Sequence, residues 1–184
     1  RSSAPRRHGV GRRHHDPALP GSGALLRLTL DRTRLAIPLE RTVLVANRLR
    51  AIKLASEFPL PGAPRVVNQL QGAGTAASVL LAVHWIRRQD SSATVAVFPS
   101  EQVVLEPFAF MQHVVRVAHF VRSHDREIVL LGARPTYPDP LCEWIELAER
   151  ISDSASEPVW RVRRLWPTPS YAAARACYAS GGSW

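Results

Sequence analysis

The sequence predicts an α/β fold in which a mostly parallel β-sheet is covered by helices on both faces. Short apolar runs rich in β-branched residues alternate with longer segments whose apolar residues recur at helical spacing. Parallel strands need a crossover of about a dozen residues, and the helical segments provide crossovers of that length. With 184 residues and 46% hydrophobic content, the chain is long enough to bury one core, so we expect one folded domain.

Residues 1–20 differ in composition from the rest of the chain. They carry five Arg, two adjacent His and three Pro without a hydrophobic period, which is typical of a disordered or displaced leader. Residues 21–184 form the predicted domain. Because the first residue is Arg1 rather than Met, we expect a chain that is cut at its N-terminus. No basic region followed by an apolar stretch opens the sequence, so no secretory signal is predicted.

The first half of the predicted domain alternates between helix and strand. Residues 25–32 have the apolar spacing of a helix, which we expect to end before Pro38 because the residue preceding a proline disfavours the helical conformation. Residues 42–47 form a β-branched run typical of a strand buried on both faces. A weaker helix is predicted over residues 48–57, and residues 65–69 form the next short strand.

The second half continues this alternation and becomes less regular after Pro140. The cleanest amphipathic helix of the chain covers residues 106–122, where apolar residues recur at the spacing of one helical face. The other predicted elements are a helix over residues 74–88, strands over residues 94–98, 127–133 and 159–166, and a helix over residues 170–179.

Candidate site residues follow the predicted strands, because ligands of open α/β sheets bind outside the carboxyl ends of the strands. The first such segment, Gln71-Gly72-Ala73-Gly74-Thr75-Ala76, places a glycine pair at the start of a helix. Glycine lets backbone N–H groups approach a ligand closely, and a helix N-terminus favours negative groups. The alternative is an ordinary loop in which the Thr75 hydroxyl caps the helix.

Two further segments follow predicted strands. In Pro99-Ser100-Glu101-Gln102, a carboxylate stands where it is able to hold Mg²⁺ against substrate phosphates. The alternative is a solvated loop acid. The last segment, Gly132-Ala133-Arg134-Pro135, follows the predicted strand over residues 127–133.

Taken together, six segments resemble one known enzyme family. They are LLRLTLDRT at residues 25–33, Gly74-Thr75-Ala76, Phe98-Pro99-Ser100, Gly132-Ala133-Arg134-Pro135, Trp144-Ile145-Glu146 and Gly181-Gly182-Ser183-Trp184. In this order and spacing the chain resembles bacterial mannose-1-phosphate guanylyltransferases over roughly residues 9–184. The resemblance implies a Rossmann-like nucleotide-diphospho-sugar transferase fold, here incomplete at both ends, with the N-terminal strand and the phosphate loop missing.

The resemblance also implies a Mg²⁺-dependent exchange. A sugar 1-phosphate oxygen attacks the α-phosphorus of GTP or another nucleoside triphosphate and displaces pyrophosphate, which requires positioning and charge neutralisation more than an activated side chain. The residues that the resemblance assigns are Gly74, Thr75, Ala76 and Ser100 for the nucleotide, Glu101 for the metal and Glu146 for the sugar. It assigns no catalytic side chain, since His14 stands where the family has a lysine.

Other positions depart from the family pattern in ways that weaken catalysis. Near the start, Gly9-Val10-Gly11-Arg12 stands in place of the family's G-G-x-G-T-R-L loop, and the imidazole of His14 is mostly neutral at pH 7. Gln102 replaces the histidine of the family's P-S-D-H element, and Glu143 fills the place of a bare glycine that a sugar approaches. Trp166-Pro167-Thr168-Pro169 lacks both charges of the family's W-E-K-P. We therefore expect little or no activity in this chain.

Two hypotheses of different kinds stay open at this point. The first is a truncated, degenerate nucleotidyltransferase of this family, and a G-G-x-G-T-R-L segment encoded before Arg1 would favour an active enzyme. The second is a non-catalytic binding or regulatory module that keeps a nucleotide or sugar-nucleotide pocket around Gly74, Thr75 and Glu101. The base, the sugar and the oligomeric state are also open.

The charge and the cysteines argue against several other classes. The net charge is +9, but the basic residues are scattered Arg with Lys53 as the sole lysine, and no aromatic residues interleave with them. We expect no nucleic-acid partner and, because no apolar run is long enough for a bilayer, no membrane partner. Cys142 and Cys177 form no C-x-x-C pair, so neither a disulfide framework nor a zinc site is predicted, and a cytoplasmic location is expected.

Several remaining residues are given structural roles. The spacings of six and five between His113, His119 and His124 do not align two imidazoles on one helical face, so these residues are expected at the surface or in the core. Asp31 and Arg32 are interpreted as a solvated pair of little energetic weight. Three tryptophans are expected to anchor the core or an interface: Trp144, Trp160 and Trp166.

Overall fold

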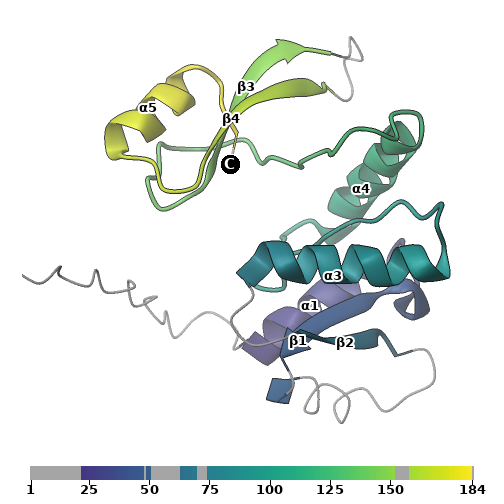
Figure 1. The fold of residues 1–184 in the computed structure, drawn as a ribbon. Coiled ribbons are helices and arrows are strands. Elements are labelled where there is room, and N and C mark those ends of the chain that lie inside the picture. The colour runs from purple at the N-terminus through teal and green to yellow at the C-terminus, as the bar shows by residue number, and fades with distance from the viewer. Residues whose placement is uncertain (1–21, 48, 51–62, 70–73, 152–157, 184) are drawn as a thin grey trace, which may run out of the picture. The chain divides into compact units, whose positions relative to one another are not determined.

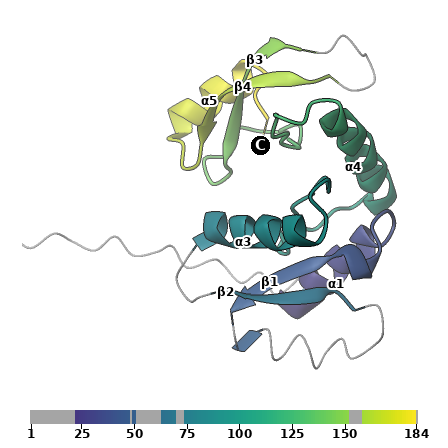
Figure 2. The same ribbon diagram turned by 45° about the vertical axis from the view of Figure 1, so that its right-hand side comes forward.

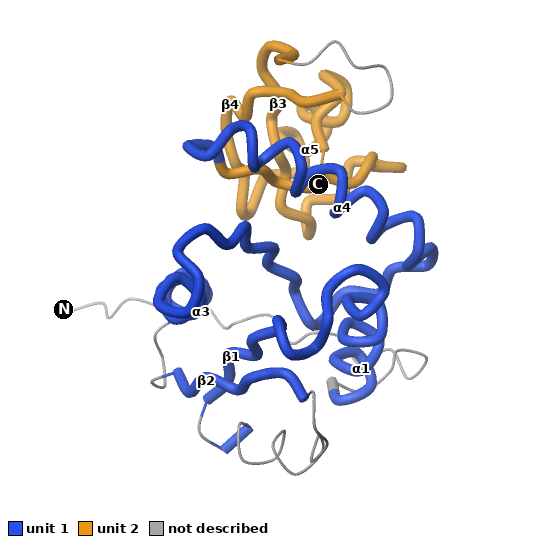
Figure 3. Tube along the Cα trace, turned by 90° about the vertical axis from the view of Figure 1, so that its right-hand side faces the viewer, with its two compact units in different colours: residues 1–127 blue, residues 128–184 orange. Residues whose placement is uncertain are grey.

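The computed structural model describes residues 22–47, 49–50, 63–69, 74–151 and 158–183. The predicted leader over residues 1–20, with His14, lies outside the described residues, as does the predicted helix over residues 48–57 apart from residues 49–50. The chain forms two compact units, residues 1–127 and residues 128–184, which Figure 3 shows in two colours. Among the described residues, no helix is both long enough and apolar enough to cross a bilayer.

The elements of each unit follow the chain in order (Figure 1). The first unit contains α1 (Ser22–Thr33), the 3-10 turn η1 (Leu39–Arg41), β1 (Val43–Asn47), β2 (Arg65–Gln69), α3 (Gly74–Gln89) and α4 (Pro107–Arg122). The second unit contains β3 (Trp144–Arg150), β4 (Trp160–Trp166) and α5 (Tyr171–Ala179).

The sheet of the first unit consists of β1 and β2, which run parallel in a continuous register from Val43 opposite Arg65 to Asn47 opposite Gln69. Side chains of a strand alternate between the two faces of its sheet. On one face, Ala46 of β1 forms a buried cluster with Leu26 and Leu30 of α1. The amphipathic spacing of α1 thus buries its apolar face against the sheet, as the sequence predicted.

The opposite face of this sheet is covered by α3. Arg65 and Gln69 project to this face, where the Arg65 guanidinium lies 5.7 Å from the ring centroid of Trp85 and the Gln69 amide contacts Ser78. Figure 2 shows α3 above the two strands, and in Figure 3 the strands lie between α3 and α1. The predicted α/β arrangement, with helices on both faces of a parallel sheet, is therefore present in this unit.

The amphipathic helix predicted over residues 106–122 is confirmed as α4. A proline stands in its first turn, where the missing N–H costs nothing and the fixed φ suits a helix. Met111 and Val114 are its buried residues. The helix ends at Arg122 and is followed by the capping residue Ser123, whose hydroxyl donates to the carbonyl of Phe120 over 2.9 Å.

Two predicted strands are wrong. Residues 94–98 and 127–133 carry β-branched and apolar residues but belong to no strand. A strand requires a neighbour with which to exchange backbone hydrogen bonds, and β1 and β2 pair only with each other in the described part of the chain. Val97 and Ile128 are accordingly 58% and 91% exposed. The mostly parallel sheet is thus limited to two parallel strands, and the predicted absence of an N-terminal strand stays a prediction.

The second unit is built on an antiparallel hairpin of β3 and β4, with irregularities in register after Glu146 and Leu147. The sequence predicted β4 but not β3, because the charged residues of Trp-Ile-Glu-Leu-Ala-Glu-Arg interrupt the apolar alternation. Trp144 is fully buried against Ala174 and Cys177 of α5, which confirms its predicted role in the core. Trp166 packs at the edge of this cluster.

The closing Gly-Gly-Ser segment pairs with the same hairpin. Ile145 and Ser183 form an antiparallel bridge, with N–H to carbonyl distances of 2.7 and 3.0 Å. A methyl group on Gly182 would lie 2.9 Å from the carbonyl oxygen of Cys177 and 3.2 Å from that of Ile145. Glycine is therefore required here by close backbone approach, which allows the segment to return from α5 to β3.

Candidate functional site

The carboxyl ends of β1 and β2 lie side by side, because Asn47 and Gln69 are paired residues of the parallel register. The Gln69 side chain links β2 to the start of α3: its Nε2 donates to the carbonyl of Gly74 over 2.9 Å, and its Oε1 accepts from the Ser78 hydroxyl. The Asn47 Oδ1 accepts from the backbone N–H of Arg50 over 3.0 Å. The sequence did not lead us to Asn47 or Gln69, although an amide side chain at the carboxyl end of each strand is a pattern that could have indicated them.

The first turn of α3 exposes Gly74, Thr75 and Ala76 at this edge. Gly74 has φ +77°, and a Cβ there would meet no atom within 4 Å, so the backbone conformation rather than space requires glycine. The helix begins at Gly74, so Thr75 stands inside the first turn rather than at the preceding cap position. That turn contains no acidic residue, and its N–H groups retain the capacity to bind an anion.

The predicted metal residue Glu101 lies in a turn with Ser100, after the irregular segment over residues 93–99. Glu101 is exposed, and the Ser100 hydroxyl lies 3.5 Å from its Oε2. Phe98, just before the turn, meets the ring of Phe110 on α4 edge-on, with centroids 6.3 Å apart. The structure describes no hydrogen bond between this turn and the first turn of α3.

The oxygen donors of this turn match the needs of Mg²⁺. The ion is usually held by one or two carboxylates together with substrate phosphates and several waters, and not by a dedicated protein cage. Ser100 and Glu101 supply one hydroxyl and one carboxylate on an exposed turn. The described residues contain no cluster of three or more His, Cys, Asp or Glu that would form a closed cage.

The interpretation of Asp31 and Arg32 as a solvated pair is wrong. Asp31 instead lies 3.8 Å from Arg34, and both of these side chains are exposed. Arg32 is buried, with 4% of its surface exposed, and desolvation lowers its pKa below the usual value. Adjacent residues of a helix point about 100° apart, whereas residues three or four apart are neighbours on its surface.

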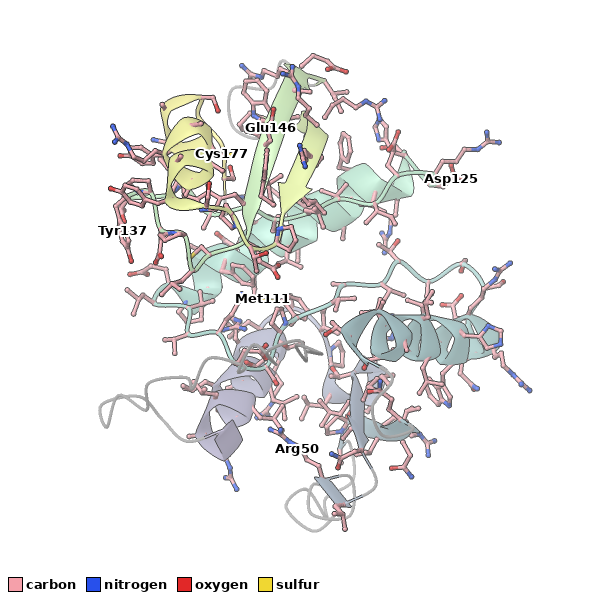
Figure 4. The ribbon with its side chains drawn as sticks, turned by 60° about the vertical axis from the view of Figure 1, so that its left-hand side comes forward. Arg50, Met111, Asp125, Tyr137, Glu146 and Cys177 are labelled. Carbon is pink, nitrogen blue, oxygen red and sulfur yellow. The ribbon has the colours of Figure 1, made fainter. Side chains whose placement is uncertain are left out.

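In the second unit, Glu146 is a half-buried residue of β3 whose carboxylate is held by β4. Its Oε2 accepts from the indole Nε1 of Trp166 over 3.0 Å, and its Oε1 lies 3.8 Å from a guanidinium nitrogen of Arg163. Figure 4 shows Glu146 on the hairpin and Cys177 on α5. The contacts fix the orientation of the carboxylate, and its predicted role in sugar binding stays a prediction.

Of the three histidines singled out by the sequence, His119 is exposed, whereas His113 and His124 have local partners. The imidazole of His124 stacks on the ring of Phe120, with centroids 4.0 Å apart. The pKa of His113 is lowered, mainly by burial and also by the positive charge of the nearby Arg116. Burial raises the pKa of both Cys142 and Cys177, so their thiolate forms are disfavoured. Trp160, the one predicted anchor that is substantially exposed, contacts the guanidinium of Arg150 at 6.0 Å.

The arrangement of the first unit is that of a nucleotidyltransferase-like α/β protein, and comparison with solved structures supports this superfamily. One matching structure is the crystal structure of a mannose-1-phosphate geranyltransferase from Thermus thermophilus, with 28% sequence identity and a TM-score of 0.70. The match covers 87% of this chain but 44% of the other, so the chain spans less than half of that protein's length. No protein-family model and no curated protein matches the sequence.

Proposed function

We propose that this chain is a sugar-nucleotide transferase domain of the mannose-1-phosphate guanylyltransferase kind, which binds GTP or another nucleoside triphosphate and a sugar 1-phosphate. The observation that carries the proposal is the structural likeness, with a TM-score of 0.70 over 87% of the chain, to a protein whose name contains mannose 1-phosphate. The family resemblance of the strand-end segments supports it independently, because it rests on the sequence alone.

The nucleotide binds at the carboxyl edge of β1 and β2 in this proposal. Gly74, Thr75 and Ala76 form the first turn of α3, and the N–H groups and dipole of a helix N-terminus favour a negative ligand. The hydrogen bonds from Gln69 to Gly74 and from Ser78 to Gln69 hold that turn against the strand end. Ser100 contributes a hydroxyl from its own turn. Preorganised donors of this type stabilise phosphate charge without a rearrangement at the moment of reaction.

Mg²⁺ is the proposed metal, with Glu101 as its protein carboxylate and Ser100 beside it. The ion would neutralise the phosphates of the nucleotide and polarise the α-phosphorus for attack. Glu146 is proposed to accept hydrogen bonds from sugar hydroxyl groups, with its orientation fixed by Trp166.

The proposed turnover is low. Glu143 is exposed and introduces bulk and a negative charge where the family leaves room for an anionic sugar phosphate. The Gln102 side chain, which replaces the histidine of the family, has no charge to offer. Loss of one preorganised donor costs roughly 2.7–4 kcal/mol of barrier, so several replacements together leave little activity.

A non-catalytic nucleotide- or sugar-nucleotide-binding module is the second candidate function. Two features favour this candidate: the first turn of α3 is exposed, and Glu143 replaces a glycine of the family. The replacement at Glu143 concerns the sugar phosphate, and nucleotide binding at the N-terminus of α3 does not depend on it. The two candidates share the nucleotide site and differ in turnover.

Pyrophosphate release tests the difference between the candidates. The chain is incubated with Mg²⁺, GTP and mannose 1-phosphate, and pyrophosphate is followed with an enzyme-coupled assay. We expect a rate at least about a hundredfold below that of ordinary enzymes of this kind, in line with the loss of one stabilising donor. The double substitution Glu143→Gly and Gln102→His, which restores the family residues, is expected to raise the rate. Turnover comparable to ordinary enzymes would contradict the degenerate form of the proposal.

A further inference from the structure

Arg32 is a buried cation at the C-terminal end of α1. Only 4% of its surface is exposed, and its Nε has no hydrogen-bond partner in the described part of the chain. No carboxylate of the described residues forms an ion pair with it. A buried charge without an opposite partner is costly, and replacing such groups by apolar ones is often neutral or stabilising. Packing stability alone therefore does not explain an arginine at this position.

One hydrogen bond of Arg32 stays within α1, from its Nη2 to the Thr29 hydroxyl over 3.5 Å, and its other contacts lead to the segment that carries the proposed metal residue. Its Nη1 donates to the backbone carbonyl of Gln102 over 3.5 Å, and its guanidinium lies 5.3 Å from the ring centroid of Phe110. Phe110 in turn meets Phe98 edge-on. Phe98 and Gln102 flank the turn of Ser100 and Glu101, so both sides of the turn contact the pair of Arg32 and Phe110.

We infer that Arg32 is a positioning residue that fixes the turn of Ser100 and Glu101 for ligand binding. It acts through the Gln102 carbonyl and the Phe110 ring, and because it is buried it does not itself touch the ligand. The identity of that ligand, a Mg²⁺-bound nucleoside triphosphate, rests on the proposed function. The anchoring of the turn rests on the contacts alone.

The variants for the test are Arg32→Met, Arg32→Lys and Arg34→Met. Methionine keeps an apolar side chain of similar length against Phe110 but removes the donor to Gln102. Lysine keeps the charge and a donor but loses the planar stacking of the guanidinium. Arg34→Met is the matched control, because Arg34 lies just beyond the same helix and is exposed beside Asp31.

The first readout is amide hydrogen exchange without any ligand. In Arg32→Met, the amides of residues 100–103 are expected to exchange about tenfold faster, since a hydrogen bond from a charged donor is worth that order of magnitude. Amide exchange within α1 and α4 is expected to stay unchanged or to become slower. The urea midpoint of unfolding is expected to stay unchanged or to rise. Arg34→Met is expected to match the wild type, and Arg32→Lys to fall between them.

The second readout is Mg²⁺-dependent binding of GTP, which is expected to weaken about tenfold in Arg32→Met because the turn is no longer held. Unchanged exchange over residues 100–103 would overturn the inference, whatever happens to binding. A general loss of protection in α1 and α4 with a lower urea midpoint would also overturn it, because Arg32 would then be merely structural. Faster exchange of the turn in a protein whose wild type binds no GTP would support the anchoring and refute the proposed function.

Discussion

Replacing Trp144 with alanine is expected to lower the free energy of unfolding of the second unit by roughly 3–5 kcal/mol, the cost of truncating a large buried aromatic side chain. Trp144 has no exposed surface and packs between β3 and α5 against Ala174 and Cys177. Its indole Nε1 also donates to the carbonyl of Asp139 over 2.7 Å. The substitution thus removes the centre of this core together with a hydrogen bond to the loop that precedes β3.

Two further variants separate the packing term from the hydrogen bond. Trp144→Phe keeps much of the apolar volume but leaves the Asp139 carbonyl without its donor, so a loss of about 1–3 kcal/mol is expected. Trp160→Ala is the control at the surface, since Trp160 is 40% exposed, and a loss below about 1 kcal/mol is expected there. Urea unfolding followed by circular dichroism measures all three. Equal unfolding midpoints for Trp144→Ala and Trp160→Ala would contradict this description of the core.

Replacing Glu101 with glutamine is expected to weaken Mg²⁺-dependent GTP binding by at least about tenfold, the lower end of the losses seen at metal sites. Glutamine preserves the size of the side chain and removes the charge that the metal requires. Glu101→Asp, which restores the residue of the family, is expected to bind at least as well as the wild type. The affinity is measured by calorimetric titration at several Mg²⁺ concentrations.

Glu106→Gln is the matched control for this experiment. Glu106 is an exposed carboxylate that stands before α4 and makes no side-chain capping hydrogen bond. Its replacement is therefore expected to leave binding and its Mg²⁺ dependence unchanged. Equal Mg²⁺ dependence in Glu101→Gln and the wild type would show that another group holds the metal.

The helices were predictable from the sequence because their signals are local. The apolar spacing of residues 25–32, 74–88 and 106–122 marked α1, α3 and α4 to within a few residues, since periodicity along one segment decides which face is buried. The helix predicted over residues 170–179 is α5, and the structure adds that the Ser170 hydroxyl caps it by accepting from the N–H of Ala173.

Strands depend on partners that lie elsewhere in the chain, and this explains the errors. Residues 42–47 and 65–69 were predicted correctly because each finds the other in the structure. Residues 94–98 have the same composition but no neighbouring strand among the described residues, so the same local signal led to a wrong prediction. The reverse occurred at β3, whose charged residues are accommodated because Glu146 is paired with Trp166 and Arg163 of β4.

The candidate site, like the fold, was predictable only where the signal lies within one short segment of the sequence. Gly74 and Glu101 could be found from their positions after apolar runs, and their proposed roles await the tests above. The contacts that support the site could not be predicted from the sequence, because they depend on how the chain folds. Gln69 of β2 contacts Gly74 and Ser78 of α3, and Arg32 of α1 contacts the backbone of Gln102. Arg32 also shows why adjacent opposite charges on a helix are a poor guide to ion pairs.

The most direct test of the central claim is a calorimetric titration of the 184-residue chain with GTP and with GDP-mannose in the presence of Mg²⁺. The proposed nucleotide site predicts a saturable heat for GTP that weakens when Mg²⁺ is removed, whether or not pyrophosphate is released. A flat trace at millimolar concentrations of both ligands would contradict the proposal that this fold retains a nucleotide site.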